Sequence, residues 1–487
     1  MIKRNRLIFL LSTLIATPWL VNPLFADGLA DFQAWQAQAN NEFQSYKDAR
    51  DKEFVTSLAN SWREINMLNA KVRDETPKLP DLPVAPEVIP NETPIEEIPA
   101  ALVLPKVAPP VAPIKPVTVK PVFGKVREVS YFGYVLRFDD KKPLRPAVKL
   151  PLTQNAVRDA WSDLSQLDYE IAVEELTTYG REFDLADWAK VQLAWQYVAA
   201  DERTKFNEKV LLTWFLLVKQ GFDAKVAFDK NFLYLVMPSD QPIYGAAYFT
   251  IEGRQYYWID LGKKGLRPHK AFTYDGKYPD AERSLDMRFA KTIQASGKDS
   301  NRQVRFEFDK AQYEINIAYA LNRIEYFKTY PQIDLKYYFE SNLYPQLGKN
   351  IVDQLQPIVS KMNEKQAVDF LLRMVQKGFP YATDANQFGE ENYLLPEEMF
   401  FYPQSDCEDR SILFAWLVRN VLGLEVVALN YPGHVATAVA FKGKVSGDAY
   451  RYQGKAFTVA DPTYINARSG MTMLNYKGVV PKIEPVL

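Results

Sequence analysis

The sequence from Ser405 to Gly423 reads SDCEDRSILFAWLVRNVLG and contains the only cysteine of the chain, Cys407. Ser405 precedes Glu408 at the S-x-x-E spacing of a capping box, in which the two side chains satisfy backbone amides of a first helical turn. The apolar run that follows predicts a buried helix reaching Leu422. The stretch therefore predicts a helix with Ser405 as its N-cap and Cys407 in its first turn.

Opposing electrostatic effects act on the sulfur at this position. The unpaired amides and the positive end of the helix dipole favour a thiolate at Cys407. Asp406, Glu408 and Asp409 disfavour it if their carboxylates point toward the sulfur. A cationic imidazole beside the sulfur would then be needed for the thiolate to form.

Two residues further along the chain can supply and orient such an imidazole. His434 begins the apolar strand pattern HVATAV, and Asp461 ends the pattern TVAD. Neighbouring strands lie about 4.8 Å apart, so a histidine on one can hydrogen-bond an aspartate on the next. The aspartate would fix the ring tautomer, and the other ring nitrogen would take the thiol proton.

The composition excludes several classes of protein. The 487 residues include one cysteine and two histidines, so neither a disulfide, a Cys-rich metal site nor a multi-histidine metal centre is expected. We predict no metal and no cofactor. With 59 basic and 60 acidic residues, there is no net positive charge to hold a nucleic acid. The second histidine, His269, is interpreted as an ordinary structural residue.

The three motifs SDCEDRS, GHVATAV and ADPTY together resemble the Cys–His–Asp core of transglutaminase-like enzymes, a branch of the papain-like superfamily. The spacing is 27 residues from Cys407 to His434 and 27 more to Asp461. The resemblance covers residues 365–470. It implies a catalytic Cys407, a base at His434, an orienting Asp461 and a papain-type fold in which the cysteine helix packs on an antiparallel sheet. The family contains peptidases, amide-transferring crosslinkers, deamidases and members without known activity, so it does not select a reaction.

Other features of the site stay open at this point. The backbone amide of Cys407 is the expected first oxyanion donor, with Gln404 or Tyr402 as the candidate side-chain donor. The segment 380–403 is expected to shape a substrate cleft. Asp384 begins a calcium-loop-like pattern there, but apolar residues at the fifth and twelfth positions argue against an EF-hand. A non-catalytic scaffold or binding protein of the cell envelope is the alternative to an enzyme.

The N-terminal region predicts export. Basic residues, an apolar run and Ala26 describe a signal peptide over residues 1–26, with an uncleaved membrane anchor as the alternative. Residues 27–75 are predicted to be helical, with apolar residues every three or four positions up to Leu68. Thirteen of the 32 prolines lie within 76–121, which predicts an extended linker. The expected location is the periplasm, the cell envelope or the medium, and the expected partner is a protein or peptide substrate.

The folded body is predicted to be α+β, with three parts. Residues 122–262 form an α+β domain, 263–345 a β-rich domain, and 346–487 the transglutaminase-like catalytic domain. A shift of 202 residues without gaps places Trp416 on Trp214, Cys407 on Lys205 and His434 on Phe232. From this register we hypothesise that 122–262 is a second, degenerate transglutaminase-like copy that lacks the nucleophile and the base.

Overall fold

The computed structural model describes residues 23–69, 83–86, 124–262, 269–289, 293–295, 297 and 299–486. This part of the chain is a mixed α+β protein, 37% helix and 26% strand, with antiparallel sheets. Two compact units are distinguished, residues 1–53 and 54–487. Nearly all of the predicted signal peptide and linker lie outside the described residues. None of the described helices is long and apolar enough to cross a membrane.

The predicted N-terminal helix is shorter than expected. Helix α1 (Pro23–Asn60) ends before Trp62, and β1 (Trp62–Asn66) pairs antiparallel with β8 (Lys270–Tyr274). The prediction of helix through residue 75 is therefore wrong for 62–66, because pairing with a distant strand outweighs a local three-to-four spacing. Phe54 and Leu58, at the end of α1, are buried as that spacing predicted.

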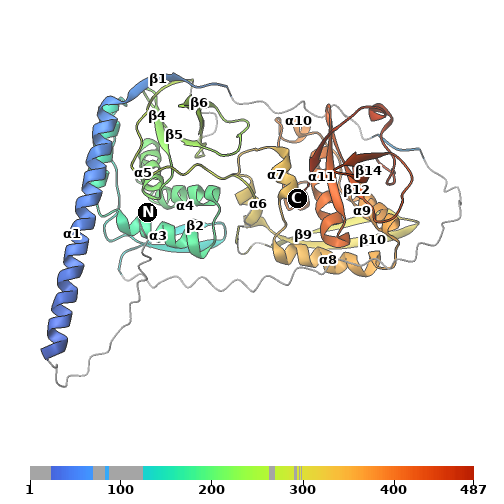
Figure 1. Cartoon of the computed structure of the whole chain (residues 1–487), viewed down its shortest axis with the longest axis horizontal. Helices are drawn as coiled ribbons and strands as arrows, with labels where there is room; N and C mark the ends of the chain where they lie inside the picture. The colour runs from blue at the N-terminus through green and yellow to red at the C-terminus, as the bar shows by residue number, and fades with distance from the viewer. Residues whose placement is uncertain are drawn as a thin grey trace. The chain divides into compact units, whose positions relative to one another are not determined.

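A six-stranded antiparallel sheet forms the core of the first half of the body, in the order β1-β8-β4-β5-β7-β6 (Figure 1). Its remaining strands are β4 (Lys225–Phe228), β5 (Leu233–Pro238), β6 (Tyr248–Ile251) and β7 (Arg254–Trp258). Because β8 is an inner strand of this sheet, the sheet extends past the boundary predicted at residue 262.

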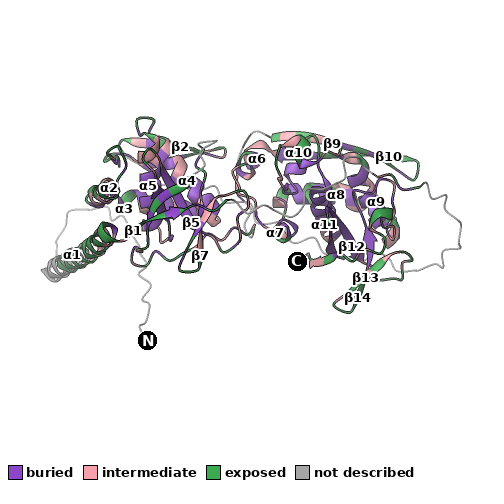
Figure 2. Ribbon diagram, turned by 90° about the horizontal axis from the view of Figure 1, so that it is seen from above, coloured by how far each residue is buried: buried purple, intermediate pink, exposed green. Residues whose placement is uncertain are grey.

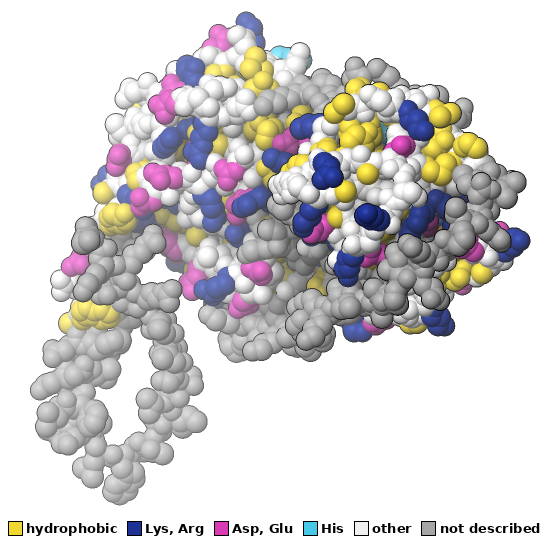
Figure 3. All heavy atoms as spheres, turned by 45° about the vertical axis from the view of Figure 1, so that its right-hand side comes forward, with side chains coloured by type: hydrophobic (Ala, Val, Ile, Leu, Met, Phe, Trp, Pro, Cys, Tyr) yellow, Lys and Arg dark blue, Asp and Glu magenta, His cyan; other side chains and the backbone are white. Residues whose placement is uncertain are grey.

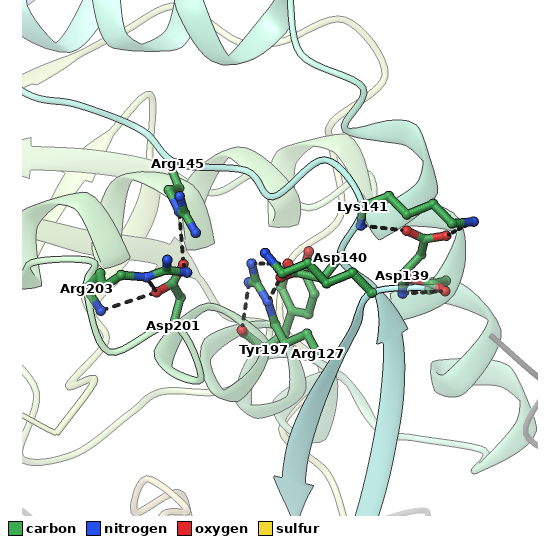
Figure 4. Close-up of polar contacts among 10 residues, drawn as sticks. Arg127, Asp139, Asp140, Lys141, Arg145, Tyr197, Asp201 and Arg203 are labelled. Carbon is green, nitrogen blue, oxygen red and sulfur yellow. Dashed lines mark hydrogen bonds and ion pairs between the residues drawn. The ribbon is translucent and has the colours of Figure 1, made fainter. Parts of the chain in front are cut away.

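Four helices and a hairpin accompany this sheet. The helices are α2 (Gln154–Ser165), α3 (Glu170–Glu182), α4 (Asp187–Ala199) and α5 (Phe206–Lys219), and the hairpin is β2 (Val126–Tyr131) with β3 (Tyr134–Asp139). Arg127 of the hairpin pairs with Asp140 at 2.7 Å and donates to the carbonyl of Tyr197 at 3.3 Å (Figure 4). Asp201 accepts from Arg203 and Arg145 beside it. The Arg127 contact fastens the hairpin to α4, and Asp201 links Arg145, which follows the hairpin, to the loop after α4.

The predicted β-rich domain at 263–345 is only partly β. It contains the long hairpin of β9 (Asp299–Phe308) and β10 (Ala311–Ala320), followed by α6 (Leu321–Phe327) and α7 (Leu335–Glu340). The hairpin packs against helices of the C-terminal part: Phe306 and Phe308 contact the Phe370 ring, with centroids 5.1 and 5.5 Å apart. The alternating pattern thus predicted the hairpin correctly, but that hairpin is packed on its neighbours and has no core of its own.

A five-stranded antiparallel sheet in the order β13-β14-β12-β11-β15 forms the C-terminal part. Its strands are β11 (Glu425–Tyr431), β12 (His434–Ala440), β13 (Ala449–Tyr452), β14 (Lys455–Ala460) and β15 (Lys482–Pro485). Its helices are α8 (Pro345–Val359), α9 (Glu364–Gly378), the short α10 (Asp384–Gln387) and α11 (Cys407–Leu417), which continues as a π-turn over Val418–Leu422. Single 3-10 turns cover Glu398–Phe400 and Leu474–Tyr476. Figure 2 shows the buried residues concentrated in α11 and β12 here, and in α5 and β5 of the first half.

The two halves share one topology. In the first, α5 is followed by strands arranged β6-β7-β5-β4, and in the second α11 is followed by β13-β14-β12-β11. Each strand occupies the same place in chain order and in its sheet, about 200 residues apart. A shared helix-plus-four-strand unit supports the hypothesis of an internal repeat. In the first copy, Lys205 precedes α5 and Phe232 precedes β5, so this copy has neither thiol nor imidazole there.

Candidate active site

Cys407 is the first residue of α11, as the sequence predicted, but the cap differs by one residue. Asp406 is the N-cap, and the Asp409 carboxylate accepts from the amides of Asp406 at 3.3 Å and Leu394 at 2.7 Å. Ser405 is instead bridged to Tyr381. The predicted Ser405–Glu408 box does not form, because the Glu408 side chain faces the thiol of Cys407.

His434 and Asp461 lie side by side on paired strands. Strand β12 begins at His434, β14 ends one residue before Asp461, and the two strands pair through Thr437 and Ala460. The predicted hydrogen bond between the two side chains is present, with 2.9 Å between Nε2 and Oδ2. The other carboxylate oxygen of Asp461 accepts from the amide of Thr463 at 2.9 Å, which fixes the orientation of the carboxylate.

The second ring nitrogen of His434 is available for proton transfer. Nδ1 is buried and has no hydrogen-bond partner among the described residues. The rings of Tyr476 and Tyr431 stack on the imidazole, with centroid distances of 5.0 and 6.2 Å. These contacts hold the ring with one nitrogen on Asp461 and the other unpaired, which is the arrangement a general base requires.

Helix α11, which begins at Cys407, packs against β12 (Figure 1). The backbone amide of Val435, next to His434, lowers the pKa of the Cys407 thiol, and this is the smallest of the effects on it. On the same helix, the Ser411 hydroxyl donates to the Val435 carbonyl at 3.1 Å. The start of β12, where His434 lies, is thus bonded to the helix that begins at Cys407.

In this conformation the thiol is neutral. Cys407 is completely buried, and its thiol donates to Glu408 Oε2 at 2.8 Å. Burial raises the pKa of the thiol well above its usual value, and the charges of Glu408 and Asp406 raise it further. Burial, together with the two carboxylates, therefore keeps the thiol protonated, and its proton points to Glu408 rather than to His434.

An acidic cluster lies beside the nucleophile. Carboxylate oxygens of Asp384, Glu391 and Asp406 lie within 4.8 Å of one another. Asp406 is fully buried, and neither of its carboxylate oxygens has a hydrogen-bond partner among the described residues. Burial raises the pKa of Asp406, and the charges of Glu408 and Asp409 add to the effect. Three convergent carboxylates are a ligand set that a hard cation such as Ca²⁺ prefers, so these residues could hold one although the EF-hand spacing is absent.

One buried cation balances part of this acidity. The Arg410 side chain is fully buried and donates to the carbonyls of Pro462, at 3.4 Å, and Phe379. Burial lowers the pKa of its guanidinium to about 10, and the charges of Tyr381 and Asp406 act in the opposite direction. Arg410 thereby ties α11 to the loop after Asp461. Arg410 belongs to the SDCEDRS motif, but the sequence did not predict that its side chain would join the helix to this loop.

Neither predicted side-chain oxyanion donor contacts the sulfur in the described structure. The Gln404 amide donates to the Tyr381 carbonyl at 3.5 Å, and the Tyr402 ring packs edge-on against Phe388. Two tyrosines, Tyr381 and Tyr476, also lie within electrostatic reach of the sulfur: burial raises the pKa of each hydroxyl, and a negative charge on Cys407 raises it further. Tyr381 falls in the segment predicted to shape the cleft, whereas no pattern pointed to Tyr476.

The surface and the comparisons leave the class of protein open. Basic and acidic side chains are interspersed over the face drawn in Figure 3, as their near-equal numbers suggest. No protein-family model, curated protein or solved structure matches the chain. A function can therefore be argued only from the geometry of Cys407, His434 and Asp461 and from the sequence motifs that contain them.

The buried Glu398, which belongs to the segment before the nucleophile, makes the stability depend on pH. Burial raises the pKa of its carboxyl from 4.5 to about 8. Between these values the folded protein holds a proton that the unfolded chain has released, so stability falls as the pH rises through this window. We expect the Tm to be lower at about pH 8.5 than at about pH 5, by on the order of 5 °C.

Scanning calorimetry at both pH values checks this expectation with two variants. Glu398→Gln should flatten the dependence, because an amide has no proton to lose. Glu307→Gln changes an exposed carboxyl of β9 and should leave the dependence as in the parent chain. An unchanged slope in Glu398→Gln would contradict the assignment.

Proposed function

We propose that the chain is a transglutaminase-like cysteine enzyme that acts on an amide bond of a protein or peptide. The observation that carries this proposal is the buried His434, which binds Asp461 through Nε2, keeps Nδ1 unpaired and precedes Val435, whose carbonyl accepts from Ser411 of the cysteine helix. The cysteine helix on an antiparallel sheet is the arrangement that a papain-type fold of this family would have. The repeated topology is consistent with 122–262 as its degenerate copy.

The proposed chemistry proceeds through a thioester. His434 Nδ1 takes the proton of the Cys407 thiol, and the sulfur attacks the amide carbonyl carbon. The C–N bond then breaks, and the leaving amine takes the proton from His434. Water or a second amine attacks the thioester and releases the thiol, which gives hydrolysis or deamidation in the first case and amide transfer in the second. The first step requires the thiol to turn from Glu408 toward His434.

The burial of Cys407 favours a second candidate function. A sulfur that is completely buried, with a raised pKa and a carboxylate as its hydrogen-bond partner, also suits a non-catalytic scaffold that keeps the fold and holds a partner in the cell envelope. In the enzyme, the same observations describe a resting state that must open to admit substrate. Both candidate functions assume that the chain is exported. That assumption rests on residues 1–26, most of which lie outside the described residues.

Turnover of unstructured protein substrates separates the two candidates. The full chain is incubated with a mixture of reduced, unfolded proteins and a fluorescent primary amine. New amino termini, released ammonia and incorporated amine are then measured for the parent chain and for Cys407→Ala. The enzyme predicts that one of these signals appears with the parent chain and is lost in Cys407→Ala. If all three are the same for the two proteins, the scaffold is the better description.

A further inference from the structure

A short part of the proline-rich segment is docked on the loop that follows Asp461. The amide of Ala85 donates to the carbonyl of Ile465 at 2.7 Å, and the amide of Ile465 donates to the carbonyl of Pro83 at 2.9 Å. Val84 and Ile465 are thereby paired as a parallel bridge. The segment predicted to be an extended linker thus makes a specific main-chain contact with the C-terminal domain.

A small apolar cluster of the C-terminal domain binds one side chain of the docked segment. Ala85 is 3% exposed and packs with Tyr464, Ala467 and Met473, whereas its neighbour Val84 is 62% exposed. Met471 and Tyr476 pack against the same cluster. A side chain larger than alanine at position 85 would have to displace these residues, whereas the side chain at position 84 is exposed to solvent.

The prolines on either side suit this mode of binding. Proline has no amide hydrogen and holds its own φ near the extended polyproline region, so the segment loses little conformational entropy when it docks. The two main-chain groups used in the contact, the Pro83 carbonyl and the Ala85 amide, are both available in a Pro-x-x-Pro segment. Recognition therefore needs an extended backbone and one small side chain.

The same tetrapeptide occurs twice in the linker. Residues 83–86 read Pro-Val-Ala-Pro, and residues 110–113, which lie outside the described residues, read Pro-Val-Ala-Pro again. The second copy therefore carries the alanine and both prolines at the spacing used by the first. Any site that binds the first tetrapeptide through these groups can bind the second.

We propose that the 464–476 loop is a docking site for an extended Pro-Val-Ala-Pro segment, and that the linker of the same chain supplies two interchangeable occupants, 83–86 and 110–113. Exchange between them would change the length of free chain between β1 and the C-terminal domain by 27 residues, the separation of the two copies. The occupied loop also contains Tyr476, whose ring stacks on His434 at 5.0 Å. Docking thus occurs next to the base of the candidate active site.

Hydrogen exchange at Ile465 tests the docking in the full chain. The double variant Ala85→Arg with Ala112→Arg should raise the exchange rate of this amide by at least about tenfold, because it loses its partner. The matched control Val84→Arg with Val111→Arg adds the same charge at exposed positions and should exchange like the parent chain. Equal exchange in the two double variants would overturn the site. Ala85→Arg alone should stay protected, since the second copy can dock; full loss in this single variant would overturn the exchange of occupants.

Peptide binding tests the same site in trans. A fluorescent peptide of residues 80–89 should bind the Ala85→Arg, Ala112→Arg chain at least about tenfold more tightly than the parent chain, whose tethered segment competes at an effective concentration of about 1 mM. The same peptide carrying Ala85→Arg should not bind. Equal affinity of the peptide for both chains would contradict occupation by the linker.

An effect of docking on the thiol rests on the proposed function. If occupancy restrains Tyr476 and His434, the Ala85→Arg, Ala112→Arg chain should react with iodoacetamide at Cys407 severalfold faster than the control double variant. An unchanged alkylation rate together with faster Ile465 exchange would overturn the coupling to the thiol and leave the docking site standing. Loss of turnover in every variant would count against the enzyme and not against the docking.

Discussion

Replacing His434 by alanine is expected to lower the rate at which iodoacetamide alkylates Cys407 by roughly 100-fold at neutral pH. The thiol is held neutral by burial, Glu408 and Asp406, so alkylation depends on a base that removes the proton. His434 is the first residue of β12 and precedes Val435, whose carbonyl accepts from Ser411 of the cysteine helix. Mass spectrometry of the intact chain over time measures the rate, since Cys407 is the only cysteine.

His269→Ala is the matched control for this experiment. It removes the only other histidine, which lies at the surface beside β8 and hydrogen-bonds through its carbonyl to the amide of Met67. Its alkylation rate should equal that of the parent chain. The rate of each variant is divided by the rate of the parent chain, because the sulfur is buried. The Tm of the parent chain and of both variants confirms that each is folded. Equal rates for His434→Ala and His269→Ala would remove His434 as the base.

Replacing Arg323 by methionine is expected to lower the free energy of unfolding by about 3–5 kcal/mol. Arg323 and Glu397 form a bidentate ion pair, with donor–acceptor distances of 2.7 and 2.6 Å. Both side chains are 2% exposed. The same carboxylate accepts from the amide of Tyr344 at 2.7 Å. Methionine fills a similar volume but leaves the Glu397 charge buried without its partner, which is the costly outcome.

Denaturant unfolding followed by tryptophan fluorescence measures this loss. The control is Arg305→Met, which breaks an ion pair with Glu314 on the exposed face of the β9–β10 hairpin and should cost less than about 1 kcal/mol. Adding Glu397→Gln to Arg323→Met should restore part of the stability, because it removes the orphaned charge. If Arg323→Met and Arg305→Met lowered the free energy of unfolding by similar amounts, the buried ion pair would contribute no more to stability than the exposed one.

The ion pair also bears on how the site is assembled. It joins α6 to the segment just before the 3-10 turn Glu398–Phe400, and that segment leads directly to Cys407. Arg323 and Glu397 belong to no sequence motif, and they are 74 positions apart in the chain. Their pairing depends on how α6 packs against the C-terminal part, which local patterns do not contain.

Local patterns predicted those parts of the site that depend on single elements or neighbouring strands. The apolar run after Cys407 predicted the helix, and the strand patterns at His434 and Asp461 predicted their hydrogen bond, because adjacent antiparallel strands bring their ends together. The strand at 62–66 was missed, since its partner β8 lies more than 200 residues away. The N-cap was predicted at Ser405, one residue before its true position at Asp406. The reason is that the buried Glu408 side chain accepts a hydrogen bond from the Cys407 thiol.

The amino-acid sequence alone determined that one thiol, one imidazole and one carboxylate occur at the spacing of a helix start and two strand ends, and that a proline-rich segment precedes the folded body. Only the tertiary structure decided the protonation of that thiol, because burial and the direction of neighbouring carboxylates set its pKa. The tertiary structure alone also brought Ala85 to Ile465 and Arg323 to Glu397, contacts between segments far apart in the chain. Such contacts follow from the packing of whole elements, and no local periodicity encodes them.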